Sequence, residues 1–176
     1  MQTLIRIYNT FVDDLFHYAV NFGFDRELIM DAIHDVFYKI SQDNSLLDNV
    51  DNIKFYLYRS LKNRLIDIVK TRKEDTMSDV SAFTENLPFN VEVNIEDLLI
   101  SEEEQTAVRS KIEEMLSVLS DRQREIIYLR YVDGYDYSDI SRLLGITVPS
   151  CHKLTYKSMQ KLRKKFGPLI LLFLIP

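Results

Sequence analysis

Apolar side chains recur at helical spacing on both sides of a break near the middle of the chain. Over 26–42 they fall on one side of a helix, at Ile29, Ile33, Val36, Phe37 and Ile40. Over 52–73 they do so again, at Leu57, Tyr58, Leu61, Leu65, Ile68 and Val69. A repeat of about 3.6 residues is typical of helices that bury one face. The pattern therefore predicts an all-α fold.

The helical pattern fails over residues 77–100, where polar residues and Pro88 interrupt the apolar repeat. We therefore expect two small helical domains, residues 1–76 and 107–166, joined by an acidic linker over 77–106. The polar residues of 43–51 predict a loop between the two helices of the first domain.

The second domain carries the signals of a helix-turn-helix. Ser120 and Gln123 form a capping box that begins one helix, and Gly134 ends it. A short helix follows, with Ile140, Leu143 and Leu144 at i, i+3 and i+4, and Gly145 makes the turn. Thr147 caps the last helix and Pro149 lies in its first turn.

The last helix has a packed side and an outer side. Its packed side holds Cys151, Leu154, Ser158, Leu162 and Phe166. In a helix-turn-helix, the N-terminal part of this helix enters the major groove of DNA. The candidate DNA contacts are therefore Thr147, Val148, Pro149, His152, Lys153, Tyr156 and Lys157.

The charge distribution agrees with a DNA-binding second half. The net charge of the whole chain is −5, but residues 107–176 hold twelve basic and seven acidic side chains. Residues 77–106 hold eight acidic side chains and no basic one. A basic module beside an acidic connector is typical of nucleic-acid binders, although a solvated basic helix face would give the same count.

The single cysteine, Cys151, excludes an internal disulfide and indicates a reducing cytoplasm. Because it falls on the packed side of its helix, we interpret it as a packing residue and not as a redox thiol. The apolar tail over 167–176 contains a run at 169–175 that is far shorter than the roughly 20 residues of a membrane span. We expect this tail to pack on the second domain; binding to a partner and a degradation signal are the alternatives.

Each helix of the first domain also has a polar face. On 26–42 it consists of Asp31, His34, Asp35 and Tyr38. A solvated surface explains this face better than a metal site, since two carboxylates and one histidine are few ligands. On 52–73 the polar face holds Tyr56, Arg59, Ser60, Asn63, Asp67 and Lys70. Cations, an amide and an aromatic ring suit single-stranded or distorted nucleic acid.

These segments together resemble the sigma factors of bacterial RNA polymerase. The stretches LSDRQREIIYLR at 119–130 and GYDYSDISRLLGIT at 134–147 resemble the family's second conserved domain. DAIHDVF at 31–37 resembles its DLVQExF segment, and FYLYRSLKNRLID at 55–67 resembles its promoter-melting helix. Because only two domains are present, the resemblance indicates the extracytoplasmic-function (ECF) class.

The resemblance implies a role for each surface. Asp31, His34, Asp35 and Tyr38 would bind core RNA polymerase, with His34 in place of the usual Gln. The 43–51 loop would capture a flipped base of the minus-ten element, and Tyr56 stands where many members carry Trp. The implied minus-ten contacts are Asn44, Asn49, Tyr56, Arg59, Asn63 and Lys70. The DNA contacts at the start of the last helix, within 147–157, would read the minus-thirty-five element.

The sequence therefore predicts an alternative sigma factor that binds core RNA polymerase and promoter DNA. Members of this class commonly have a membrane-bound anti-sigma factor, which is a candidate partner here. The alternative is a helix-turn-helix regulator whose N-terminal helices sense a signal or dimerise. An enzyme is not favoured, because no phosphate loop, nucleophile elbow or paired Cys/His ligand spacing is present, and we expect no cofactor.

Overall fold

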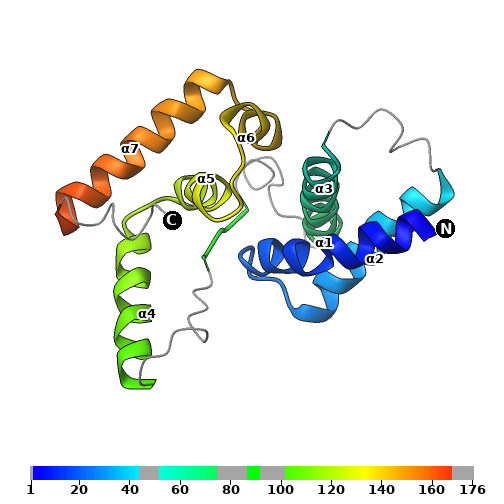
Figure 1. Ribbon diagram of the computed structural model, residues 1–176, viewed down its shortest axis with the longest axis horizontal. Helices are drawn as coiled ribbons and strands as arrows, with labels where there is room; N and C mark the ends of the chain where they lie inside the picture. Colours follow the sequence, from blue (N-terminus) through cyan, green and yellow to red (C-terminus); the bar gives the residue numbers. More distant parts are fainter. Residues whose placement is uncertain (1, 44–51, 75–86, 92–101, 168–176) are drawn as a thin grey trace. The chain divides into compact units, whose positions relative to one another are not determined.

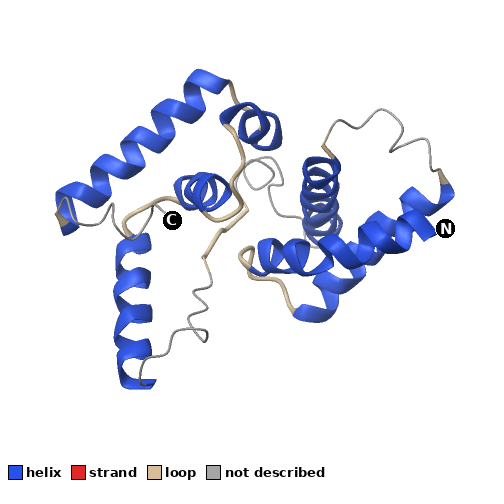
Figure 2. Ribbon diagram, viewed as in Figure 1, coloured by secondary structure: helices blue, strands red, loops and turns tan. Residues whose placement is uncertain are grey.

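The computed structural model describes residues 2–43, 52–74, 87–91 and 102–167, and all regular structure in these ranges is helical (Figure 2). The chain divides into two compact units, Met1–Pro88 and Phe89–Pro176. The predicted all-α class is confirmed.

The first unit contains α1 (Gln2–Val20), α2 (Arg26–Gln42) and α3 (Ile53–Glu74), and each helix packs on the other two (Figure 1). The side chains excluded from solvent include Leu15, Tyr18, Ile29, Ile33, Ile40, Leu57, Tyr58, Leu61 and Leu65. At the centre the Tyr18 and Tyr58 rings lie 4.7 Å apart. The apolar faces predicted for 26–42 and for the first half of 52–73 therefore form this core.

Local signals set the start of α2. Asp25 is the N-cap, and its Oδ1 accepts a hydrogen bond from the Leu28 amide at 2.9 Å. This bond satisfies one of the amides that the first turn of a helix leaves unpaired. The helix bounds agree with the predicted range 26–42.

The second unit contains α4 (Glu102–Ser117), α5 (Asp121–Tyr131), α6 (Tyr137–Leu144) and α7 (Val148–Phe166). Helices α5, α6 and α7 pack on one another and form the expected helix-turn-helix (Figure 1). The Ser120 capping box is present, and Thr147 caps α7. Gly145 ends α6 with φ +64°, a conformation that residues with a Cβ rarely adopt.

A side chain of α5 fixes the turn of this motif. Arg122 Nη2 donates a hydrogen bond to the Leu144 carbonyl at 2.7 Å. That carbonyl belongs to the last turn of α6, where intrahelical donors run out. The bond ties α5 to the point at which the chain turns into α7.

The structure differs from the expected 77–106 linker at two places. Helix α4 begins at Glu102, so the three consecutive glutamates form a first helical turn, where acidic side chains complement the helix dipole. Phe89 is buried and belongs to the second unit: its amide donates to Asp121 Oδ1 at 3.1 Å. The Arg124 guanidinium donates to the Phe89 carbonyl at 2.5 Å, and the Phe89 and Tyr128 rings lie 5.6 Å apart.

Some expectations lie outside the described residues. They concern Asn44 and Asn49, the 43–51 loop beyond its first residue, and the packing of the tail. Within the described ranges, no helix combines the length and the apolar character that crossing a bilayer requires.

The N-cap of α6 gives a prediction on acid stability. Asp136 Oδ1 accepts a hydrogen bond from the Asp139 amide at 2.8 Å, and this bond lowers the pKa of Asp136 below its ordinary 3.8. A carboxyl with a lowered folded pKa stabilises the fold above its unfolded pKa and loses this effect as the pH falls through the folded one. We expect Asp136→Ala to reduce the free energy of unfolding by about 1 kcal/mol near neutral pH.

The difference between wild type and Asp136→Ala should shrink as the pH falls below about 3.8. Urea unfolding across a pH series measures it. Asp136→Asn is the matched control, because it keeps an acceptor that does not titrate. A wild-type and an Asn variant with the same acid sensitivity would contradict the assignment.

Candidate nucleic-acid interface

The polar stripe of α2 consists of Asp31, His34, Asp35 and Tyr38, which follow one another at i, i+3, i+4 and i+7. All four side chains are exposed, and Tyr38 retains 66% of its accessible surface. We call this surface the α2 stripe. Its position opposite the buried face agrees with the polar face predicted from the sequence.

Two members of the α2 stripe have partners on neighbouring helices. Arg64 of α3 binds Asp35 through its Nε, 2.8 Å from Oδ2, and its Nη2, 2.7 Å from the same oxygen. His34 Nε2 lies 3.2 Å from the Tyr8 hydroxyl of α1. Any ligand of Asp35 or His34 would therefore compete with these contacts.

The polar side chains of α3 line a groove against α2. The groove has a volume of about 390 Å³. Its walls are Asp35, Val36 and Lys39 of α2 and Tyr56, Ser60, Asn63, Arg64 and Asp67 of α3. It brings together Tyr56 and Asn63, as the predicted polar face of 52–73 implies, and it adds Asp35, which was assigned to the other surface. Arg59, exposed, and Lys70, partly exposed, are not among its walls.

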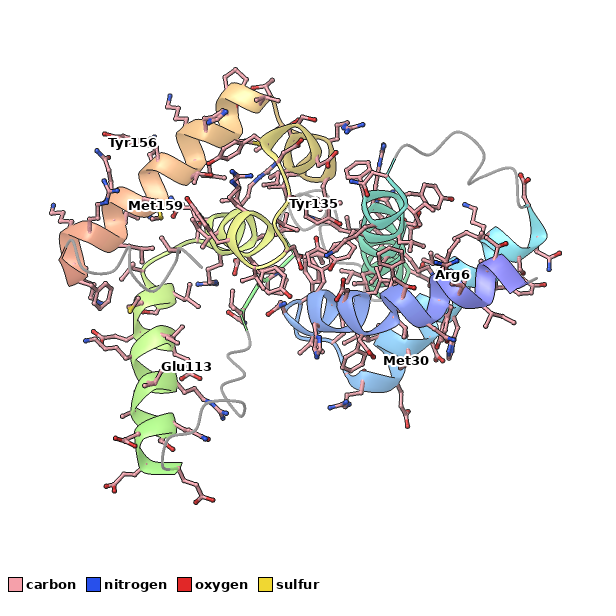
Figure 3. The ribbon with its side chains drawn as sticks, viewed as in Figure 1. Arg6, Met30, Glu113, Tyr135, Tyr156 and Met159 are labelled. Atoms are coloured by element: carbon pink, nitrogen blue, oxygen red, sulfur yellow. The ribbon has the colours of Figure 1, made fainter. Side chains whose placement is uncertain are left out.

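Six residues form the α7 outer face: Val148, Pro149, His152, Lys153, Tyr156 and Lys157. All six are exposed, and Tyr156 retains 61% of its accessible surface. Figure 3 shows Tyr156 on the outer side of α7 and Met159 on the side toward α5. Thr147 is exposed as well, but its hydroxyl oxygen caps the helix by accepting from the Ser150 amide at 3.3 Å.

The inner side of α7 is anchored by Cys151, Ser158 and Leu162, which are exposed by at most 1%. Ser158 satisfies its hydroxyl by donating to the Leu154 carbonyl at 2.8 Å. Burial raises the pKa of the Cys151 thiol. A buried thiol with a raised pKa is a poor nucleophile, in agreement with its interpretation as a packing residue.

The cations of α7 differ in availability. Lys161 Nζ donates to Gln123 Oε1 at 2.9 Å, and Lys165 Nζ lies 3.8 Å from Glu114 Oε1. Within the described part of the chain, Lys153 and Lys157 have no acidic partner within salt-bridge distance. These two ammonium groups are therefore available to phosphate.

Two contacts join residues of different helices, and the periodicity of a single helix does not predict them. Arg64 holds Asp35, and Tyr137 of α6 lies against the ring of His152, with 3.9 Å between the ring centroids. The described residues contain no group of three or more His, Cys, Asp or Glu that could hold a metal ion.

Comparison with known proteins places the chain in a family. The family model described as "Sigma-70, region 4" matches residues 109–162, which include α5, α6 and most of α7. The ECF RNA polymerase sigma factor SigW of Bacillus subtilis (strain 168) is 30% identical over 132 residues, which cover 70% of this chain and 68% of SigW. SigM of the same organism is 24% identical over 175 residues, covering 94% of this chain and 96% of SigM.

A solved structure has the same fold. It is that of the sigma factor RpoE in complex with the anti-sigma factor NepR from Bartonella quintana. The likeness has a TM-score of 0.65 at 15% identity and covers 93% of this chain and 96% of RpoE. The solved structure shows likeness of fold, and the SigW alignment over 132 residues extends the family likeness beyond the helix-turn-helix. The chain belongs to the ECF class of RNA polymerase sigma factors, alternative factors that direct promoter-specific initiation of transcription.

Proposed function

We propose that the two units of this sigma factor divide the work between them. The first unit binds core RNA polymerase through the α2 stripe and opens the minus-ten element with α3. The second unit reads the minus-thirty-five element with the α7 outer face. The observation that carries this proposal is the orientation of α7, whose inner side is buried while Lys153 and Lys157 face solvent.

The protein would act without catalysis of its own, because its contribution is binding and positioning. It would work in the cytoplasm, where core polymerase and promoter DNA are found. RpoE of Bartonella quintana was solved in complex with an anti-sigma factor. We extend this kind of partner, in a membrane-bound form, to the present chain.

The runner-up, a simple helix-turn-helix regulator, explains only the second unit. The likeness to SigM covers 94% of the chain, so it extends over most of the first unit as well. Co-purification separates the two functions, since a sigma factor binds core polymerase and a simple regulator binds duplex DNA alone.

The α2 stripe is tested best at Asp31, which is exposed and, among the described residues, forms no ion pair of the kind that Arg64 makes with Asp35. We expect Asp31→Lys to weaken binding to core polymerase by roughly 1.5–3 kcal/mol, the range for hydrogen bonds to charged groups. Asp13→Lys, on the exposed side of α1, makes the same charge change and serves as the control. Fluorescence titration of labelled protein with core enzyme measures the affinity. Equal affinities for wild type and a folded Asp31→Lys variant would exclude this surface.

The Asp35 carboxylate needs a second comparison because it also holds Arg64. Asp35→Asn and Arg64→Gln both break the ion pair. If Asp35 binds polymerase, Asp35→Asn should weaken core binding more than Arg64→Gln does. A purely structural ion pair would make the two variants equal.

Promoter opening is expected to depend on Tyr56 and Asn63, the aromatic ring and the amide of the groove. Asn63→Ala should impair open-complex formation more than duplex binding. Tyr56→Ala should cost about 1–3 kcal/mol in stacking, and Tyr56→Phe should cost little. Permanganate footprinting on a promoter recovered from run-off transcription of a genomic library measures the bubble. Asn9→Ala on α1 controls for loss of an exposed amide; a normal bubble in Asn63→Ala would refute the role.

The α7 outer face should separate phosphate contacts from base contacts. Lys157→Ala should weaken binding to all duplexes alike and lower the salt slope by about one unit. His152→Ala should relax preference at one base pair by roughly 1–3 kcal/mol. Lys164→Ala, near the far end of α7, is the matched lysine control. If neither His152→Ala nor Lys157→Ala changes affinity, preference or salt slope across a range of salt concentrations, α7 is not the reader.

A further inference from the structure

Three side chains from three helices form a stack beside the α7 outer face. Arg130 of α5 places its guanidinium carbon 4.9 Å from the centroid of the Tyr137 ring. The Tyr137 ring lies against the His152 ring, with centroids 3.9 Å apart and planes inclined by 39°. We call this arrangement the α5–α6–α7 stack. It joins a candidate base-reading side chain to two residues outside the candidate set.

Two contacts hold Tyr137 in place, one to its ring and one to its backbone. Arg130 Nη1 donates to the Tyr135 carbonyl at 2.8 Å, so its guanidinium is fixed to the loop before α6. Tyr137 is the first residue of α6, directly after the N-cap Asp136. The cap fixes the backbone of the first turn, and the cation lies over the ring. Tyr137 is therefore a rigid support.

His152, in contrast, is not held by burial, because its side chain is exposed on the α7 outer face. An unsupported histidine in solvent samples several rotamers, and ordering it on DNA reduces affinity. Contact with Tyr137 covers one ring face and limits this sampling. Base edges are read by the ring nitrogens at the edge of the imidazole, which a stacked neighbour does not cover.

We propose that Tyr137 is a positioning residue for promoter specificity, which orders the His152 ring for reading one base pair and itself contacts no base. The inference rests on the proposed role of α7 and deepens it. Tyr137 acts through an aromatic ring, so phenylalanine should replace it and an aliphatic side chain should not.

The first measurement needs no DNA. Because the rings lie so close, we expect ring currents from Tyr137 to shift the ring-proton resonances of His152 upfield in the NMR spectrum of the full chain. Tyr137→Leu should move these resonances toward their unstacked positions, and Tyr137→Phe should not. The chain has three histidines, so loss of signals in His152→Ala identifies the resonances. Unchanged resonances in Tyr137→Leu would overturn the inference whatever the DNA result.

The second measurement uses the protein assembled with core RNA polymerase and a pool of synthetic duplexes that carry a randomised segment. Sequencing of bound and input DNA gives the preference at each position. His152→Ala and Tyr137→Leu should both reduce discrimination at the same base pair, by about tenfold. Tyr137→Phe should retain it, and the Tyr137→Leu, His152→Ala double variant should lose no more than His152→Ala alone.

Other outcomes contradict the inference in distinguishable ways. A uniform loss over all sequences in Tyr137→Leu would make Tyr137 a phosphate contact, and additive losses in the double variant would make it an independent reader. A gain of discrimination would mean that the stack withholds His152 from DNA. If His152→Ala itself leaves every preference intact, the base-reading role in the proposed function fails as well.

Discussion

Burial of the inner side of α7 is the interaction on which the candidate DNA surface depends. Cys151, Ser158 and Leu162 lose nearly all of their accessible surface, and they occupy one side of the helix. Turning α7 about its axis would expose these side chains and bring Lys153 or Lys157 toward the interior. Burial of an unpaired charge is unfavourable by far more free energy than an apolar contact contributes. The Arg122 bond to Leu144 and the Gly145 turn fix where the helix starts. The orientation and the starting point of α7 together decide which of its residues can enter the major groove of DNA.

In the first unit, the apolar core likewise fixes which helix faces are exposed. Here, however, the α2 stripe and the groove between α2 and α3 share a side chain. Asp35 belongs to the α2 stripe and also to the wall of the groove that holds Tyr56 and Asn63. Its ion pair with Arg64 is about half exposed on both sides, at 50% and 45%, and such pairs contribute only about 0–1 kcal/mol. Helix packing does not depend on this pair. A partner can therefore exchange it without disturbing the three-helix core.

The sequence predicted the features that a single helix determines by itself. The bounds of α2, the Ser120 capping box, the Thr147 cap and the exposed side of α7 all agree with the structure. Helix α4 was missed in part because none of its side chains is fully buried, so its apolar stripe is weak beside its glutamates. The Arg64–Asp35 pair and the Tyr137–His152 contact join residues of different helices. Periodicity carries no information on such contacts, because it does not place one helix against another.

Phe89 illustrates a further limit and has a practical consequence. Phe89 lies in a segment without helical periodicity, yet its ring lies against Tyr128 and its carbonyl accepts from Arg124. Arg124 also donates to the Leu119 carbonyl at 2.8 Å, so one guanidinium holds the segment before α4 to the start of α5. A recombinant fragment that begins at residue 107 would lack Phe89. It would therefore expose the Tyr128 ring to solvent and leave Arg124 without the Phe89 carbonyl as a hydrogen-bond acceptor. The compact C-terminal unit begins at Phe89, upstream of its first helix, so a fragment meant to keep these contacts has to include Phe89.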